Sequence, residues 1–207
     1  MKNYYLILPE KPSPFLKEMI DMATKNIEYE VLEYYDNLPN LKGKKIIFGI
    51  ELPITGISNS LNKFFMKLFN RGYDSLLGSE GIVIVHSQYQ YFTKTAAQSI
   101  IFMSNLLGCR FPGRPIVEAT GNLNNFIPLQ KVYNLPLEEI CLYLCKELGE
   151  RFVKDKVQKV KNPKILVLHS SNRMFSNTLT LWDMVKENLN DIKITEIKHL
   201  GYHHIFL

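Results

Sequence analysis

The chain has 207 residues, of which 46% are hydrophobic and 22% are charged, and its net charge is +5. This composition excludes collagen, low-complexity and fully disordered proteins, and at roughly 150 residues per domain the length fits one large domain, or one domain and part of another. The apolar runs fall well short of the roughly 20 residues that a membrane helix requires, and Pro and Glu interrupt the N-terminal segment before a signal-peptide core develops. We therefore expect a cytoplasmic protein with no membrane partner.

The cysteines and lysines point to no special chemistry. Cys109, Cys141 and Cys145 are an odd number for a disulfide scaffold and form no Cys-x-x-Cys pair, so we expect reduced, buried thiols and no metal site. The lysines are spread along the chain except for an excess between residues 154 and 164. We interpret this excess as a solvated linker and expect no nucleic-acid partner.

Strand and helix patterns alternate from the first residues. Residues 4–8 form a short apolar strand, and apolar side chains at helical spacing predict an amphipathic helix over 13–26. Residues 29–35 alternate, as in a strand near an edge. Residues 45–49 are almost continuously apolar, which predicts a central strand covered on both faces.

The alternation continues to residue 152. The same criteria predict five more elements, which are a helix capped by Ser58 or Ser60 and ended by Gly72, a strand over 81–85, a helix over 93–107, a strand over 115–119 and a helix over 137–152. Five strands whose connections are long enough for crossovers indicate an α/β fold with a doubly wound five-stranded parallel sheet. We assign this domain to residues 1–155.

After a basic linker over 156–163 the pattern starts again. A strand over 164–168, a helix over 176–189 and a strand over 193–200 predict an additional C-terminal βαβ unit within residues 164–207. A lone βαβ unit cannot cover both faces of its own small sheet. Three alternatives follow: the unit extends the first sheet, pairs with another chain, or begins a second domain.

A candidate phosphate loop lies in this unit, where the sequence HSSNRMFSNT follows a strand and opens a helix. Small hydroxyl side chains at the positive end of a helix offer backbone N–H groups, hydroxyls and the guanidinium of Arg173 to a phosphate. The alternative is an ordinary helix cap by Ser176, with Arg173 in solvent. Spacing alone does not decide between them.

The segment KILVLHSSNRMFSNT resembles the opening of the NAD(P)H-dependent FMN reductase family of flavodoxin-like proteins, in which a strand precedes a Gly-Ser-Pro-Arg…Ser-Asn-Thr phosphate loop. This chain has Ser170 and Asn172 where the family has Gly and Pro. The segment TEIKHL resembles the second strand of the family. The resemblance implies that five residues would surround the phosphate of FMN: Ser171, Arg173, Ser176, Asn177 and Thr178.

The first domain resembles the same family over its later elements. KKIIFGI and SNSLNKFF resemble the third strand and the helix after it, and QSIIFMSNLLG and GRPIVEATG resemble the fourth helix and the fifth strand. The resemblance therefore implies one flavodoxin-like domain and the start of a second.

The loops that face the ligand in this family differ here. LPEKPSP replaces the phosphate loop after the first strand, where its prolines remove N–H donors and Glu10 would repel a phosphate. ELPI and SQYQYF follow the third and fourth strands in place of ring-stacking and Gly-rich segments. Position at the strand ends still suggests five candidates for contact with a flavin ring: Pro53, Thr55, Ser87, Gln88 and Tyr89.

Two further features after the fourth strand each have two interpretations. Tyr89, Tyr91 and Phe92 could form an aromatic platform for a ligand or fold back on the surface as loop residues. His86 could polarise a bound carbonyl or be a hydrogen-bonded histidine at the rim of the sheet.

The resemblance implies an FMN-dependent oxidoreductase that passes two electrons from NAD(P)H to a flavin, a quinone or another small-molecule electron acceptor. Because the flavin would perform the redox chemistry, no catalytic side chain need be evident in the sequence. Proteins of this kind are commonly dimers, and we expect a homodimer. The alternative is a non-catalytic flavodoxin-like scaffold or dimerisation domain that has lost flavin binding.

Overall fold

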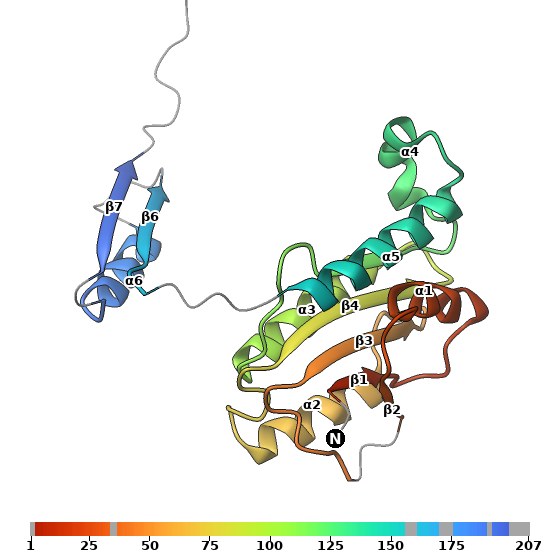
Figure 1. Cartoon of the computed structure of the whole chain (residues 1–207), viewed down its shortest axis with the longest axis horizontal. Coiled ribbons are helices and arrows are strands. Elements are labelled where there is room, and N and C mark those ends of the chain that lie inside the picture. Colours follow the sequence, from red (N-terminus) through yellow and green to blue (C-terminus); the bar gives the residue numbers. More distant parts are fainter. Residues whose placement is uncertain (1–2, 34–36, 156–160, 170–175, 190–191, 199–207) are drawn as a thin grey trace, which may run out of the picture. The chain divides into compact units, whose positions relative to one another are not determined.

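The computed structural model of the protein describes residues 3–33, 37–155, 161–169, 176–189 and 192–198. It divides into two compact units, Met1–Asp155 and Lys156–Leu207 (Figure 1). Of the basic linker expected over 156–163, residues 156–160 lie outside the described residues.

The first unit contains the doubly wound five-stranded parallel sheet predicted from the sequence, which is confirmed. Its strands have the order β2-β1-β3-β4-β5. Their bounds are Tyr4–Ile7 (β1), Glu30–Leu32 (β2), Lys45–Leu52 (β3), Glu80–Ser87 (β4) and Ile116–Ala119 (β5). The short, alternating β2 lies at an edge, whereas the apolar β3 lies in the middle, since a strand buried on both faces has no polar face to expose.

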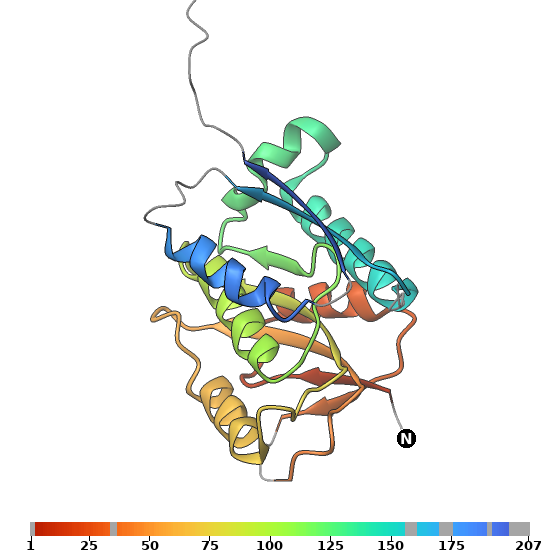
Figure 2. The same cartoon turned by 90° about the vertical axis from the view of Figure 1, so that its left-hand side faces the viewer.

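Helices cover both faces of this sheet (Figure 2). On one face lie α1 (Pro14–Thr24) and α5 (Leu137–Lys154), whose apolar side chains share a core with Ile47 and Ile84 of the sheet. On the other lie α2 (Asn59–Arg71) and α3 (Thr93–Leu106). Ser13 caps α1 and Ser58 caps α2, each accepting the backbone N–H three residues later.

Two connections differ from the simple alternation of strand and helix. Between β2 and β3, the described residues 37–44 form no helix, and the buried side chains of Leu38 and Leu41 fill the core in its place. Between β5 and α5, the chain forms a 3-10 turn over Asn124–Phe126 and a short helix, α4 (Ile127–Tyr133), which the sequence analysis did not predict. No side chain caps α4, so the polar cap that usually marks a helix start is missing, although Pro128 lies in its first turn.

The second unit consists of two strands and a helix. Strands β6 (Lys164–His169) and β7 (Lys193–Lys198) are parallel and form a two-stranded sheet of their own, and α6 (Asn177–Lys186) connects them. In this unit Leu166, Leu168 and Ile197 remain half or more exposed, because the described part of the unit does not cover both sheet faces.

A close contact joins α1 and α5 at Gly149. A Cβ atom added there would lie 1.8 Å from the carbonyl oxygen of Ala23, and backbone cannot yield as a flexible side chain can. The two helices can approach this closely only because residue 149 has no side chain.

We expect Gly149→Ala to lower the free energy of unfolding by about 2 kcal/mol or more, through overpacking of this contact. In an unconstrained helix the same substitution would stabilise the helix by about 1 kcal/mol. The sign of the change in stability therefore shows whether α1 and α5 are in close contact at this position. Urea denaturation measures it, with the neighbouring exposed substitution Glu150→Ala as the control. A stabilised Gly149→Ala protein would show that α1 and α5 are further apart.

Candidate functional site

The carboxyl ends of β1, β3 and β4 meet at one edge of the first sheet. After β1 the chain passes to β2 on one side and then to β3 on the other, so the strand order reverses between β1 and β3. Doubly wound sheets bind ligands in the crevice outside such a point. A cavity of about 440 Å³ lies there, lined by Glu10, Glu51, Leu52, Pro53, Ile54, Gln88 and Tyr89.

Beside this cavity, three residues that follow or end three different strands form one hydrogen-bonded cluster, Ser13, Glu51 and His86. The backbone N–H of Ser13 donates to Oε2 of Glu51 at 3.0 Å. Nδ1 of His86 lies 2.7 Å from Oε1 of Glu51 and 3.0 Å from Oγ of Ser13. Glu51 and His86 stand opposite each other in the register of β3 and β4, so the sheet itself sets this geometry.

The chemistry of the donors fixes the direction of these bonds. An ionised carboxylate only accepts, so Nδ1 of His86 carries the proton that it shares with Glu51. Oγ of Ser13 accepts the N–H of Leu16 and thereby caps α1. Serine and glutamate meet the same ring nitrogen, whereas a hydrolytic Ser-His-acid triad uses the two nitrogens separately. The cluster therefore joins strand ends to a helix end and does not form a nucleophile.

Burial and hydrogen bonding have opposite effects on the pKa of Glu51. Its side chain is 15% exposed and that of His86 is 8% exposed. Burial raises the pKa of Glu51, but the hydrogen bonds from His86 and Ser13 outweigh it and hold the pKa below its usual value of 4.5. Glu51 is therefore an ionised carboxylate at neutral pH, at the N-terminus of α1.

The N-terminus of the helix after β1 is where a doubly wound fold offers N–H groups to a phosphate. Here the N–H of Ser13 is donated to Glu51, Pro14 has none to donate, and the N–H of Leu16 is donated to the Ser13 hydroxyl. Glu10 adds a second carboxylate, which accepts from Oγ of Ser58 at 3.0 Å. These residues do not fit a phosphate group.

The rest of the cavity is suited to a planar ring. Leu52, Pro53 and Ile54 supply apolar walls. Tyr89, which is 43% exposed, supplies an aromatic face, and the Gln88 amide offers both a donor and an acceptor. The residues present therefore match the two parts of FMN differently: the apolar and aromatic lining of the cavity suits a ring, whereas the end of α1 does not suit a phosphate.

The five residues predicted to contact the ring lie in three different settings. Pro53, Gln88 and Tyr89 line the cavity. Ser87 is fully buried, donates to the carbonyl of Leu52 at 3.2 Å and accepts the N–H of Tyr89 at 3.2 Å, so it holds the loop that carries Tyr89. Thr55 lines a neighbouring apolar groove between α2 and α3.

The aromatic residues of the loop after β4 lie in different settings, and His86 is part of the rim of the sheet. Tyr89 lines the cavity, whereas Tyr91 is exposed and Phe92 lines the groove between α2 and α3. His86 is hydrogen-bonded at the rim of the sheet, and its ring makes a T-shaped contact with Phe15 at a centroid distance of 5.5 Å.

The predicted phosphate loop of the second unit is described only in part. Ser171 and Arg173 lie outside the described residues. Ser176 caps α6, since its Oγ accepts the N–H of Leu179 at 3.3 Å. Asn177 and Thr178 are exposed in the first turn of α6. Binding of a phosphate by these residues stays a prediction.

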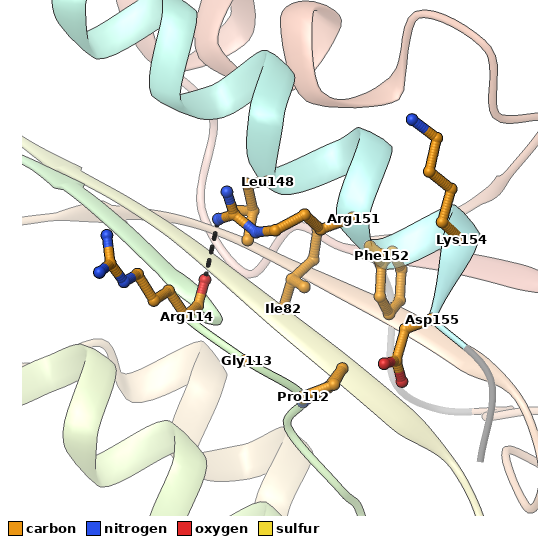
Figure 3. Close-up of a pocket in the computed structure, with 9 residues that line it drawn as sticks. All are labelled: Ile82, Pro112, Gly113, Arg114, Leu148, Arg151, Phe152, Lys154 and Asp155. Carbon is orange, nitrogen blue, oxygen red and sulfur yellow. Dashed lines mark hydrogen bonds between the residues drawn. The ribbon is translucent and has the colours of Figure 1, made fainter. Parts of the chain in front are cut away.

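A second cavity, of about 310 Å³, lies at the amino ends of β4 and β5 (Figure 3). Arg151 donates there to the carbonyl of Arg114 at 3.3 Å. Arg110 pairs with Glu80 at 2.6 Å and also with Asp155, so charged groups connect β4 to the end of α5. We interpret this polar network as structural, because it lies at the sheet edge opposite to the one where such folds bind ligands.

Three further features of the described part of the chain concern metal ligands, disulfides and membrane-spanning helices. There, no group of three or more His, Cys, Asp and Glu side chains is placed to hold a metal ion. The three cysteines are free and buried. Among the helices that the structure describes, none is both long and apolar enough to span a membrane.

Glu10 and His86 could be singled out from the sequence individually, and Glu51 only as part of the segment ELPI, but their arrangement with Ser13 was not predicted. The signal was present, because the polar residues follow strands whose carboxyl ends must meet at one edge of a parallel sheet. What the sequence could not supply was the register that sets Glu51 opposite His86.

We expect Glu51→Gln to lower the free energy of unfolding by about 1.5–3 kcal/mol at neutral pH, the range for hydrogen bonds to a charged group. Since folding lowers the pKa of Glu51, the contribution of this carboxylate to stability is complete above pH 4.5. It is lost as the pH falls through the lowered pKa of the folded state. Urea denaturation at a series of pH values should show the gap between the two proteins closing on acidification. Glu150→Gln, at an exposed position of α5, serves as the control, and a gap that persists in acid would contradict the assignment.

Comparison with known proteins identifies the fold. No protein-family model and no curated protein matches the chain. Among solved structures, oxidised Flavodoxin 1 from Bacillus cereus matches with a TM-score of 0.53 and 19% identity over 74% of this chain and 99% of that chain. The Trp repressor binding protein from Bacillus subtilis matches with a TM-score of 0.48 and 15% identity, over 70% of this chain and 99% of that one. An azoreductase from Bacillus anthracis str. Sterne matches with a TM-score of 0.48 and 11% identity, over 73% and 100%. Together with the strand order, the match to Flavodoxin 1 shows that this chain contains a flavodoxin-like fold, as the resemblance implied.

Proposed function

We propose that the protein is a flavin-linked oxidoreductase whose first unit binds a flavin ring in the cavity at the ends of β3 and β4. The observation that carries this proposal is the position of the cavity, at the point where the strand order of a flavodoxin-like sheet reverses, together with its apolar and aromatic lining. The resemblance of the sequence to NAD(P)H-dependent FMN reductases supports NAD(P)H as the electron donor and a small molecule as the acceptor.

The residues of the cavity would bind and orient the ring. Tyr89 offers its face for stacking, and the side chain of Gln88 can exchange hydrogen bonds with the polar edge of the ring. Leu52 and Ile54 would add apolar contact to the ring. When bound, a flavin supplies the two-electron chemistry, so the protein need contribute only position and electrostatics.

The buried hydroxyl of Ser87 would act indirectly in this proposal. By bridging the carbonyl of Leu52 and the N–H of Tyr89, it connects the two loops that form the cavity walls. The spacing between those walls is therefore set by the sheet and not by the exposed loop tips.

We expect the purified full chain to retain a flavin and to show its visible absorption bands, and we expect NAD(P)H to bleach them. Tyr89→Ala should weaken flavin binding about fivefold or more, because an aromatic pair contributes roughly 0.5–1.5 kcal/mol beyond its buried area. Fluorescence titration with riboflavin and with FMN measures both affinities.

Tyr91→Ala is the matched control, since Tyr91 lies in the same loop, is exposed and is not among the residues that line the cavity. Equal effects of the two substitutions would place the ring elsewhere. A protein that binds neither flavin would support the alternative, a flavodoxin-like scaffold without a cofactor.

A further inference from the structure

The position that a flavodoxin-like fold offers to a phosphate is already filled by a carboxylate of the chain itself. Glu51 receives the N–H of Ser13 on one oxygen and Nδ1–H of His86 on the other, at 3.0 and 2.7 Å. The N-terminus of α1, which would otherwise attract an external anion, therefore already has the carboxylate of Glu51 as its negative partner.

Glu51 cannot readily move aside for a ligand. It belongs to the last part of β3, where the register pairs it with His86 of β4, and both side chains are largely buried. Displacing it would leave the Ser13 N–H and the His86 ring without their acceptor and would leave a carboxylate at the rim without donors. Each such loss is costly in a partly buried site.

The charges around the cavity also disfavour an anion. Its lining includes two carboxylates, those of Glu10 and Glu51, and no lysine or arginine is among the lining residues that the structure describes. A phosphate monoester carries about −1.5 to −2 charges at neutral pH and would meet like charge without a compensating cation. A ring without a phosphate would meet no such penalty.

We infer that Glu51 is a specificity-determining residue that makes the cavity select a ring compound without a phosphate, so that riboflavin binds more tightly than FMN. This inference rests on the proposed function, because it concerns which flavin the cavity takes. It reverses the cofactor preference that the resemblance to FMN reductases implies, and its physical cause is one carboxylate at the end of β3.

The test is a pair of fluorescence titrations of the full chain with riboflavin and with FMN, which differ only by the phosphate. For the unsubstituted protein we expect riboflavin to bind at least about tenfold more tightly, which corresponds to roughly 1.4 kcal/mol. Glu51→Gln keeps the shape and one of the two acceptor oxygens while removing the charge, and it should reduce this ratio about fivefold or more, through tighter FMN binding.

Glu10→Gln provides a second variant that depends little on stability, because Glu10 lies in a loop and has one described hydrogen bond, from Ser58. It should shift the ratio in the same direction. Glu150→Gln, at an exposed position of α5, should leave the ratio unchanged. Repeating the titrations with Arg173→Ala removes any contribution of the predicted phosphate loop in the second unit.

The outcomes separate the inference from the proposed function. If FMN binds as tightly as riboflavin or more tightly, or if a folded Glu51→Gln protein keeps the ratio unchanged, the inference is wrong and flavin binding stands. If Glu51→Gln does not fold, an unchanged ratio in Glu10→Gln overturns the inference. If neither flavin binds to the unsubstituted protein, the proposed function fails, and the inference fails with it.

Discussion

The hydrogen bonds that Glu51 accepts from Ser13 and His86 connect the parts of the first unit that matter for function. They join the end of β3 to the end of β4 and to the start of α1, three segments far apart in the sequence. The cluster thereby gives α1 its N-terminal partner and the cavity one of its walls. A single carboxylate acts both as part of the structure and as part of the site, which is why its substitution should affect stability and ligand preference together.

The fold around this cluster follows the general pattern of its class, with two local solutions. A loop with two buried leucines covers part of one sheet face where the alternation would place a helix. Arg71 at the end of α2 donates to the carbonyl of Pro39 at 2.8 Å and also to that of Leu38, so the loop is held by backbone acceptors. The sheet requires that its apolar faces be covered, and here a loop covers part of one face where a helix would be more common.

Much of this architecture could be predicted from the sequence. The apolar run over β3 predicted its central position, and the alternation over β2 predicted its edge position. The reason is that the pattern of apolar residues depends on whether a strand is buried on one face or on both. The helix α4 could not be predicted, because it is short and has no side-chain cap. In the candidate site, the sequence indicated which segments follow β3 and β4, but the pairing of Glu51 with His86 depends on strand register, which the turns and the core determine jointly.

Gly149 makes the stability of α5 depend on its packing against α1. A glycine inside a helix costs about 1 kcal/mol of helix stability, so α5 gains less from forming alone than from packing on α1. Sliding α5 by one residue would place Leu148 or Glu150 against the carbonyl of Ala23, where no side chain fits. The axial position of the helix is therefore fixed to a single residue. This places the carbonyl of Phe152 beside Nζ of Lys45 and brings Asp155 to Arg110. The chain thus leaves the first unit from a defined point.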